Sequence, residues 1–328
     1  MKEIKEFHLF AGIGGGIYGG KLLGHHCCGG VEIDQFCTDV LKQRQKDGWL
    51  EPFEIYGDLT KLDGTQFRGT FDVLCGGFPC QAFSHAAHGK NIAEKNLWGE
   101  MFRFVQESEA PVVFGENVTE KAIMTAKKDL ESVGYTVEAC CLSCEDLGAD
   151  HRRNRYWLLA FKNREQAEDM SYDGVLSFDP WTVEPDKCGT EQCGGKRRQQ
   201  LKAIGNAQSP VVAATAFVIL VNRHKKPGKY GLKVRDAELS AVYRKQKSWI
   251  REKYGDDFGL VHTPTTMANY SAKSMMKHQG CRNFVTVFDR PSPLNAEWLM
   301  GFPIGASYPG PVGGEGLNLW KRGLNTSE

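Results

Sequence analysis

The sequence predicts an α/β fold with a mostly parallel sheet in its first 160 residues, followed by a smaller and more irregular C-terminal part. Two observations predict the sheet. Short runs rich in β-branched and aromatic residues alternate with helical patterns. Each run ends in Gly, Asn, Pro or an acidic residue, at the edge where open α/β sheets bind ligands. A third observation predicts the C-terminal part, because the chain turns polar and irregular after residue 162.

The strands and helices alternate in order. Runs typical of strands occupy six ranges: Phe7–Phe10, Gly30–Ile33, Phe71–Cys75, Pro111–Gly115, Thr136–Leu142 and Tyr156–Phe161. Helical patterns lie between them over Gln35–Lys46, Trp98–Glu109 and Glu120–Val133. A further helix is expected over Val211–Val221, after Pro210. Strands separated by helices form βαβ units, so we expect the sheet to be mostly parallel.

The composition is that of a globular protein. Of the 328 residues, 41% are apolar and 25% are charged. No apolar stretch approaches the roughly 18 residues of a membrane span, and no signal peptide opens the chain, so we expect a soluble, cytoplasmic protein. The net charge of +1 neither indicates nor excludes a nucleic-acid partner, because a phosphate-binding surface needs only local positive charge. Between Arg223 and Lys253, eleven basic residues stand against three acidic ones, which fits a DNA-contacting surface or an ordinary solvated one.

The eleven cysteines would suggest disulfides in a small secreted domain, but this length and the missing signal favour reduced thiols. Cys140, Cys141 and Cys144 form one group, and Cys188 and Cys193 form another. Neither group has CxxC spacing joined to a matching second pair, as structural zinc sites usually do. We therefore expect scattered free thiols and no metal site, with zinc as the alternative.

A glycine-rich turn follows the first strand. The run Leu9-Phe10-Ala11-Gly12-Ile13-Gly14-Gly15-Gly16 stands before a helix, where glycines let the backbone approach a nucleotide-like cofactor and the helix N-terminus offers free N–H groups. Glu32 ends the next strand about twenty residues on, where an acid can hold both ribose hydroxyls. Asp58 ends a third segment and could receive the adenine amino group. Each acid alone would more simply be an exposed loop carboxylate.

A cysteine-containing loop leaves the end of a later strand. In Cys75-Gly76-Gly77-Phe78-Pro79-Cys80-Gln81-Ala82-Phe83-Ser84, a Pro-Cys pair after two glycines presents the Cys80 thiol in a constrained, accessible turn. Glu116 and Asn117 end the next strand, and Asp150-His151-Arg152-Arg153-Asn154-Arg155 brings a basic cluster to the start of another. A loop thiol, a strand-end carboxylate and alternating arginines together suit nucleophilic attack on an anionic polymer.

These residues resemble the cytosine-C5 DNA methyltransferase family over most of residues 7–220. Phe10-Ala11-Gly12-Ile13-Gly14-Gly15 is similar to the family's first motif. Glu32 matches its ribose-binding acid, and Asp58 matches the position that contacts the adenine ring. Gly77-Phe78-Pro79-Cys80-Gln81 resembles the catalytic loop, and Glu116-Asn117-Val118 resembles the ENV motif.

Two further matches follow in the family's order. Arg153 and Arg155 match the paired arginines of the QxRxR motif. Gly205-Asn206-Ala207-Gln208-Ser209-Pro210 resembles the GNxxxP element that closes the cofactor pocket. Several matches in the same order make coincidence a poor explanation.

Three features depart from the family pattern. His8 stands in place of an acid before the first motif, and His151 in place of the glutamine of QxRxR, which questions one loop-orienting hydrogen bond. Only about fifty residues separate the arginine motif from the GNxxxP element, too few for a full recognition domain. Thr263-Pro264-Thr265 and the segment 293–303, similar to the family's penultimate motif, lie beyond that element. The order is therefore rearranged, as in some phage and prophage members.

The resemblance implies a Rossmann-like S-adenosylmethionine-dependent methyltransferase domain with a smaller, irregular DNA-recognition lobe. It divides the chain into a catalytic and cofactor-binding domain at 1–162, a linker or insertion at 163–196, a returning GNxxxP segment at 197–221 and a recognition lobe at 222–328. The implied enzyme is a DNA (cytosine-5-)-methyltransferase that acts as a monomer on a cytosine flipped out of duplex DNA, with S-adenosylmethionine as its cofactor. Restriction-modification is the setting this implies.

The resemblance also implies roles for individual residues. The expected catalytic residues are Cys80, Glu116, Arg153 and Arg155. The expected cofactor-binding residues are Phe10, Ala11, Gly12, Ile13, Gly14, Glu32, Ile33, Asp58, Leu59, Pro79, Leu97, Asn206 and Ala207. Five residues are expected to contact DNA: Gln81, Ser84, Arg223, Lys225 and Lys226. We name no metal ligand.

Three other functions remain open from the sequence. A tRNA cytosine-C5 methyltransferase of the same fold would carry a Cys-Phe-Thr segment, which this chain lacks. A DNA-binding regulatory homologue without catalysis would not need an intact Cys80, Glu116 and arginine pair. An enzyme that transfers another group from an altered cofactor would use the same Cys80 and Glu116.

Overall fold

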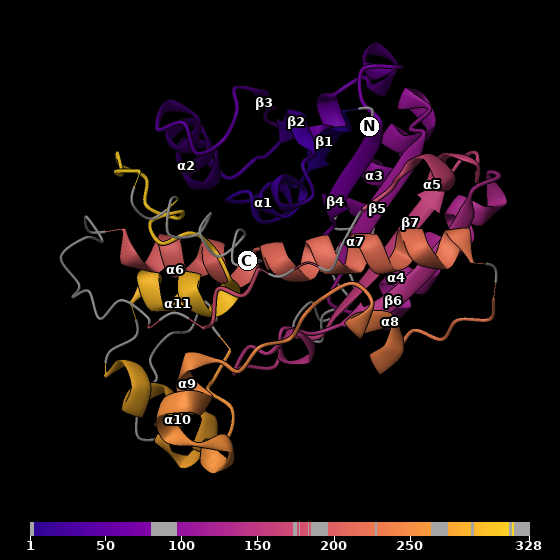
Figure 1. Ribbon diagram of the computed structural model, residues 1–328. Coiled ribbons are helices and arrows are strands. Elements are labelled where there is room, and N and C mark those ends of the chain that lie inside the picture. The colour runs from indigo at the N-terminus through magenta and orange to yellow at the C-terminus, as the bar shows by residue number, and fades with distance from the viewer. Residues whose placement is uncertain are drawn as a thin grey trace.

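The structure is a computed structural model (Figure 1). It describes residues 3–79, 97–172, 176, 178–182, 184, 196–226, 228–263, 275–289, 292–314 and 317.

One seven-stranded sheet forms the centre of the described chain, in the order β3-β2-β1-β4-β5-β7-β6. Its strands are β1 (Lys5–Leu9), β2 (His26–Val31), β3 (Glu54–Tyr56), β4 (Val73–Gly77), β5 (Val112–Asn117), β6 (Thr136–Leu142) and β7 (Arg155–Phe161). The first five strands in this order run parallel, while β7 is antiparallel to both β5 and β6. The predicted mostly parallel sheet is confirmed, and the six predicted strands lie within a few residues of the observed ones.

The α-helices follow in chain order as α1 (Gly15–Leu22), α2 (Gln35–Lys46), α3 (Leu97–Ser108), α4 (Glu120–Ser132), α5 (Gln166–Asp169), α6 (Arg197–Asn206), α7 (Pro210–Lys225), α8 (Asp236–Ser240), α9 (Trp249–Tyr254), α10 (Gln279–Phe288) and α11 (Pro293–Met300). Short 3-10 helices are η1 (Leu59–Lys61), η2 (Gly64–Phe67), η5 (Glu145–Leu147), η7 (Asp256–Phe258) and η8 (Met275–Lys277). The helix α2 begins where the sequence predicts, because the Asp34 side chain accepts hydrogen bonds from two backbone N–H groups of its first turn.

Helices cover both faces of the sheet, which gives three layers (Figure 1). Alternate residues of β4 point to opposite faces, so Val73 and Cys75 pack in one core and Leu74 in the other. The first core includes apolar residues of α1, α2, α7 and α11, and the second includes those of α3 and α4. This two-sided burial is what a mostly parallel sheet requires.

The helix α7 is the most apolar element of the described chain. Its first twelve residues, Pro210–Val221, are all buried. By length and composition the stretch Arg197–Lys225 could cross a membrane, but 83% of its most apolar window is buried inside the protein. A mostly buried core helix passes the same test, so this stretch is weak evidence of a membrane span.

The chain order places a ligand site at the boundary between β1 and β4. From β1 the chain moves outward through β2 to β3, and it then returns to β4 on the other side of β1. The loops that leave β1 and β4 therefore diverge at their C-terminal ends. Open α/β sheets bind ligands at such a switch point.

The stretch 222–328, which the sequence assigns to one recognition lobe, contributes to two places. Helices α9 and α10 lie together, away from the sheet (Figure 1). By contrast, α11 packs against α6, and the segment after it reaches α2, where Arg44 donates to the Gly305 and Gly310 carbonyls. Some residues beyond the predicted boundary at residue 221 therefore pack with the first domain.

Candidate active site

A cavity of about 380 Å³ opens at the switch point. Its walls come from the turn after β1, the ends of β2 and β4, the start of η1, and the segment between α6 and α7. This volume lies in the usual range for a small-molecule or cofactor site. Eleven predicted cofactor residues line it: Phe10, Ala11, Gly12, Glu32, Ile33, Asp58, Leu59, Pro79, Leu97, Asn206 and Ala207.

The turn after β1 is shaped by backbone conformations that most residues avoid. Phe10 has φ +55° and Gly12 has φ +55°, while Gly14 has φ +88° and precedes α1. A bulky residue in the left-handed region is strained and is usually found at functional sites. The Gly12 N–H donates to Glu32 Oε2 and the Gly14 N–H donates to the Ala11 carbonyl, so hydrogen bonds within the protein hold this turn beside the cavity.

Glu32 lies at the cavity wall and is held by the backbone. Its Oε2 accepts from Gly12 N at 2.6 Å, and its Oε1 accepts from Asp34 N at 2.7 Å. Burial raises the pKa of the Glu32 carboxyl despite these two hydrogen bonds. Each carboxylate oxygen keeps a lone pair for a further donor, so the group can accept hydrogen bonds from a ribose diol.

Ile33 and Asp58 add an apolar side chain and a second carboxylate to the cavity wall. Ile33 is 76% exposed and lines the cavity. It is one of two exposed large hydrophobic side chains within the described residues. An exposed apolar side chain beside Glu32 fits a ligand that covers it with a flat apolar ring. Hydrogen bonds from Thr60 lower the pKa of the partly exposed Asp58 carboxyl, so this acceptor stays ionised. Together these residues fit the ribose and adenine of S-adenosylmethionine.

The two remaining predicted cofactor residues have other positions. Ile13 is fully buried in the first core, and neither Ile13 nor Gly14 lines the cavity. The structure instead adds Gly15, Gly16 and Gln208, among others, to the wall. The glycine run itself could have indicated Gly15 and Gly16, whereas no sequence signal marks Gln208 as a wall residue.

Glu116 lines the cavity and pairs with Arg155. Glu116 is in the buried strand β5, and Arg155 begins the neighbouring antiparallel strand β7. Arg155 Nε lies 3.0 Å from Glu116 Oε1, and the side chains are 18% and 10% exposed. An ion pair this far from solvent orients the carboxylate toward the cavity and keeps a charged donor beside it.

Arg153 holds the GNxxxP segment instead. The guanidinium donates from Nη2 to Gly205 O at 2.8 Å and to Ala207 O at 2.9 Å. Burial, together with the charge of Arg155, lowers the pKa of Arg153 to about 10, which leaves it charged at neutral pH. The structure therefore gives the two predicted arginines different surroundings, one at Glu116 and one under the cofactor-pocket segment.

Three predicted residues of the cysteine loop, Cys80, Gln81 and Ser84, lie outside the described residues. Pro79, the residue before Cys80, lines the cavity. The carbonyl of Phe78 accepts a hydrogen bond from the Asn117 side chain at 2.8 Å. The ENV segment thus fixes the strand end from which this loop leaves.

His151 is fully buried, and neither ring nitrogen has a hydrogen-bond partner among the described residues. Burial, with the nearby charges of Arg153 and Arg155, lowers the pKa of His151 to about 3, so the ring is neutral. On sequence grounds, a histidine at this position puts in doubt one hydrogen bond that would orient the loop. Within the described part of the chain, His151 makes no such hydrogen bond.

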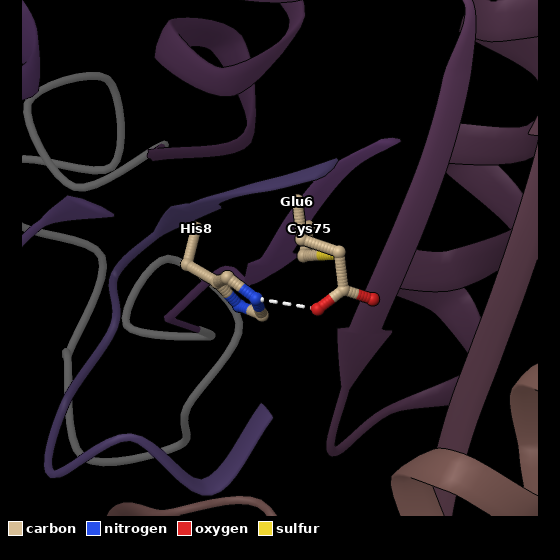
Figure 2. Close-up of side chains that lie close together, drawn as sticks. All are labelled: Glu6, His8 and Cys75. Atoms are coloured by element: carbon tan, nitrogen blue, oxygen red, sulfur yellow. Dashed lines mark hydrogen bonds and ion pairs between the residues drawn. The ribbon is translucent and has the colours of Figure 1, made fainter. Parts of the chain in front are cut away.

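His8 lines the cavity and belongs to a buried hydrogen-bonded network with Glu6 (Figure 2). Its Nε2 lies 2.9 Å from Glu6 Oε2, while His25 Nδ1 lies 2.6 Å from Glu6 Oε1 and His25 Nε2 lies 2.7 Å from the Tyr172 hydroxyl. Burial alone would raise the pKa of Glu6, but His25 and His8 outweigh it and lower the pKa to about 2. The acid that the family has at position 8 thus has a counterpart two residues earlier, on the same face of β1.

Glu6, His8 and Cys75 also lie close enough to bind a metal ion, since their donor atoms are within 4.8 Å of one another (Figure 2). Cys75 faces His8 across the β1–β4 pairing. Hydrogen bonds to histidine already satisfy both Glu6 oxygens, so the cluster is stable without a metal. Cys140, Cys141 and Cys144 are free thiols in the structure.

The three basic residues predicted for DNA contact differ in accessibility. Arg223 is 2% exposed, and its guanidinium pairs with Glu238 at 2.8 Å and donates to the Ala139 and Gly231 carbonyls. Its donors are used inside the protein, so the prediction for Arg223 is wrong on structural grounds. Lys225 is half-buried and Lys226 is exposed, which leaves both available to a partner.

Comparisons with known proteins agree with this site. A family model described as C-5 cytosine-specific DNA methylase matches residues 4–185. Type II methyltransferase M.MspI of Moraxella sp is 31% identical over 192 residues, 54% of this chain and 43% of that protein. M.HhaI of Haemophilus parahaemolyticus is 29% identical over 181 residues, 52% and 53% of the two chains. M.CviJI of Paramecium bursaria Chlorella virus IL3A is 27% identical over 223 residues, which are 66% of this chain and 59% of that protein. The matched parts span about half the length of these relatives.

Proposed function

Because this chain belongs to the C-5 cytosine-specific DNA methylase family, we propose that it transfers a methyl group from S-adenosylmethionine to C5 of cytosine in duplex DNA. We also propose that the protein acts as a monomer in the cytoplasm. The observation that carries the proposal is that Glu116, paired with Arg155, lines the same cavity as Glu32 and Asp58. A base-recognising carboxylate and a nucleoside-binding wall thus share one cavity.

Glu32, Ile33 and Asp58 would hold the cofactor, which supplies an electrophilic methyl group. Cytosine C5 is a poor nucleophile until a thiolate adds at C6 and converts C5 into an enamine carbon. We assign that addition to Cys80, the residue after Pro79. Once C5 carries the methyl group, loss of the C5 proton and cleavage of the C6–sulfur bond restore the aromatic ring and the thiolate.

Glu116 would bind the N3 and amino edge of the flipped base. Negative charge develops on the ring as sulfur adds, and a proton shared between Glu116 and N3 offsets it. Arg155 keeps the carboxylate oriented, while Arg153 acts through the segment 205–207. Removing the base from the stack costs a few kcal/mol, which binding to this edge partly offsets.

The proposal is tested with purified protein, duplex DNA and radiolabelled S-adenosylmethionine, and bisulfite sequencing then locates the modified bases. We expect label at cytosine C5 and a covalent adduct on duplex that contains 5-fluorocytosine. Cys80→Ser should abolish both. The exposed Cys28 provides a matched control, so Cys28→Ser should retain activity. Full activity of Cys80→Ser would refute the nucleophile assignment, and absence of cytosine label with folded wild-type protein would refute the function.

A further inference from the structure

We propose that Gln208 is a positioning residue for Glu116, holding the second oxygen of the carboxylate that Arg155 holds by the first. This inference rests on the proposed function, since it concerns the residue assigned to the cytosine edge. Gln208 lies in the segment between α6 and α7 and lines the cavity. The distances and the surrounding glycines carry the argument.

The Glu116 carboxylate is contacted from two sides. Arg155 Nε lies 3.0 Å from Oε1, and Gln208 Nε2 lies 3.4 Å from Oε2 and donates to it. One contact comes from β7 and the other from the segment between α6 and α7. Together they restrain rotation of the carboxylate about the bond that joins it to the rest of the Glu116 side chain. A neutral amide donor also stabilises the ionised form without adding charge.

Two glycines, one in α1 and one in β4, leave room for the Gln208 side chain. A Cβ at Gly16, in the first turn of α1, would lie 2.6 Å from Gln208 Oε1. A Cβ at Gly77, at the end of β4, would lie 2.9 Å from Gln208 Nε2 and 2.8 Å from Glu116 Oε2. Contacts this short do not occur with real side chains, so a side chain at either glycine would displace the Gln208 amide from its place.

The backbone of Gln208 is fixed as closely as its side chain. A Cβ at Gly15 would lie 2.2 Å from the Gln208 carbonyl oxygen, which places α1 directly against this residue. The preceding carbonyl, that of Ala207, accepts the hydrogen bond from Arg153. Gln208 is thus held between the cofactor turn, the strand end that leads to Cys80, and the arginine motif. A side chain in this position can link the positions of these three elements to the position of Glu116.

The test uses three substitutions in the full chain. Gln208→Glu keeps the shape but places a second carboxyl beside Glu116, and like charges at this distance favour a shared proton. Gln208→Met removes the donor without adding charge. Gln208→Asn keeps the amide on a shorter side chain. Gln106, exposed on α3, provides the controls Gln106→Glu and Gln106→Met. Thermal unfolding confirms that each variant is folded.

The first readout is independent of activity. The Glu116 carboxyl is followed by its ¹³C chemical shift at pH 7 in protein labelled at glutamate Cδ, with Glu116→Gln for assignment. We expect this chemical shift to change in Gln208→Glu and in Gln208→Met, because each substitution removes the amide donor beside the carboxylate. The Gln106 variants should match the wild type. A wild-type chemical shift in both Gln208 variants would overturn the proposal.

The second readout separates positioning from cofactor binding. In single-turnover methylation, Gln208→Met should lower the rate constant about tenfold or more, with KM for S-adenosylmethionine changed less than about threefold. Gln208→Asn should recover part of the rate. A rate unchanged in Gln208→Met while the wild type methylates cytosine would contradict positioning alone. A wild type that does not methylate cytosine would instead refute the proposed function, and the chemical shift of the Glu116 carboxyl would still decide the contact.

Discussion

Arg155 and Glu116 form an ion pair across two neighbouring antiparallel strands, with Nε and Oε1 3.0 Å apart. The residues are 39 positions apart in the sequence and belong to different motifs. Their contact arises because β7 reverses direction relative to β5 and brings its first residue beside the last residues of β5. The pair turns a strand-end carboxylate into an oriented group at the cavity wall.

Arg155→Gln is expected to lower the single-turnover methylation rate about 100-fold, because a poorly solvated carboxylate loses its charged partner. Arg155→Lys should recover part of the loss, since an ammonium group supplies the charge without the planar geometry. The control is Arg152→Gln, whose side chain is 65% exposed and pairs with Glu145. An exposed pair contributes about 1 kcal/mol at most. Equal effects of Arg155→Gln and Arg152→Gln would contradict the assigned role.

Arg153→Lys is expected to weaken binding of S-adenosylmethionine about tenfold, measured by calorimetry without DNA. The guanidinium donates to two carbonyls of the cavity-wall segment, at Gly205 and Ala207, and lysine cannot reproduce this geometry. Binding must be referred to the folded fraction, because burial of the site predicts a loss of stability as well. Unchanged affinity in a folded variant would show that the segment keeps its shape without Arg153.

Arg223 and Lys226 lie on the same stretch of chain but differ in accessibility. Arg223 is buried and pairs within the protein, while Lys226 is exposed. Arg223→Ala is expected to lower the free energy of unfolding by about 3 kcal/mol, because it leaves Glu238 without its buried partner. Lys226→Ala should change stability by less than about 0.5 kcal/mol. If Lys226 contacts a phosphate, the same substitution lowers the salt dependence of DNA binding by about one ion. Denaturant titration and binding at several salt concentrations measure the two effects.

Glu6 predicts a loss of stability in acid. Its pKa of about 2 lies below the ordinary value of 4.5, so its contribution is present above pH 4.5 and is lost as pH falls toward 2. The groups that face it are His8, His25 and Cys75. The shift corresponds to roughly 3 kcal/mol at neutral pH.

Denaturant unfolding of wild type and Glu6→Gln at pH 7 and pH 3 tests this expectation. The stability difference between the two proteins should be large at pH 7 and clearly smaller at pH 3. Glu165→Gln, at an exposed position, controls for the general effect of acid. A difference that stays constant with pH would show that the Glu6 charge does not contribute as described.

Local patterns were sufficient for most of the elements. The range Gln35–Lys46 is predicted without error, because the Asp34 cap and the helical period are both readable in the sequence. Thr136–Leu142 is likewise predicted at both ends. The ends of other strands shift by a few residues, since pairing with a neighbouring strand decides them and pairing is not a local property.

Much of the candidate site was also predictable. Glu32, Asp58 and Glu116 end or follow strands, and parallel strands bring such ends to one edge of the sheet, where all three line the cavity. Arg223 shows the limit of this reasoning. A basic run indicates charge but not which side chains are exposed, and Arg223 faces inward to Glu238.

By itself, the sequence determined the α/β alternation, the cofactor turn, the strand-end acids and the family, because each is recorded in neighbouring residues. Tertiary structure alone decided that His25 meets Glu6 and Tyr172, that Arg44 holds the segment around Gly305, and that Gln208 reaches Glu116. These contacts join residues 19 to 261 positions apart. They form only when the sheet order and helix packing are in place, so no local pattern encodes them.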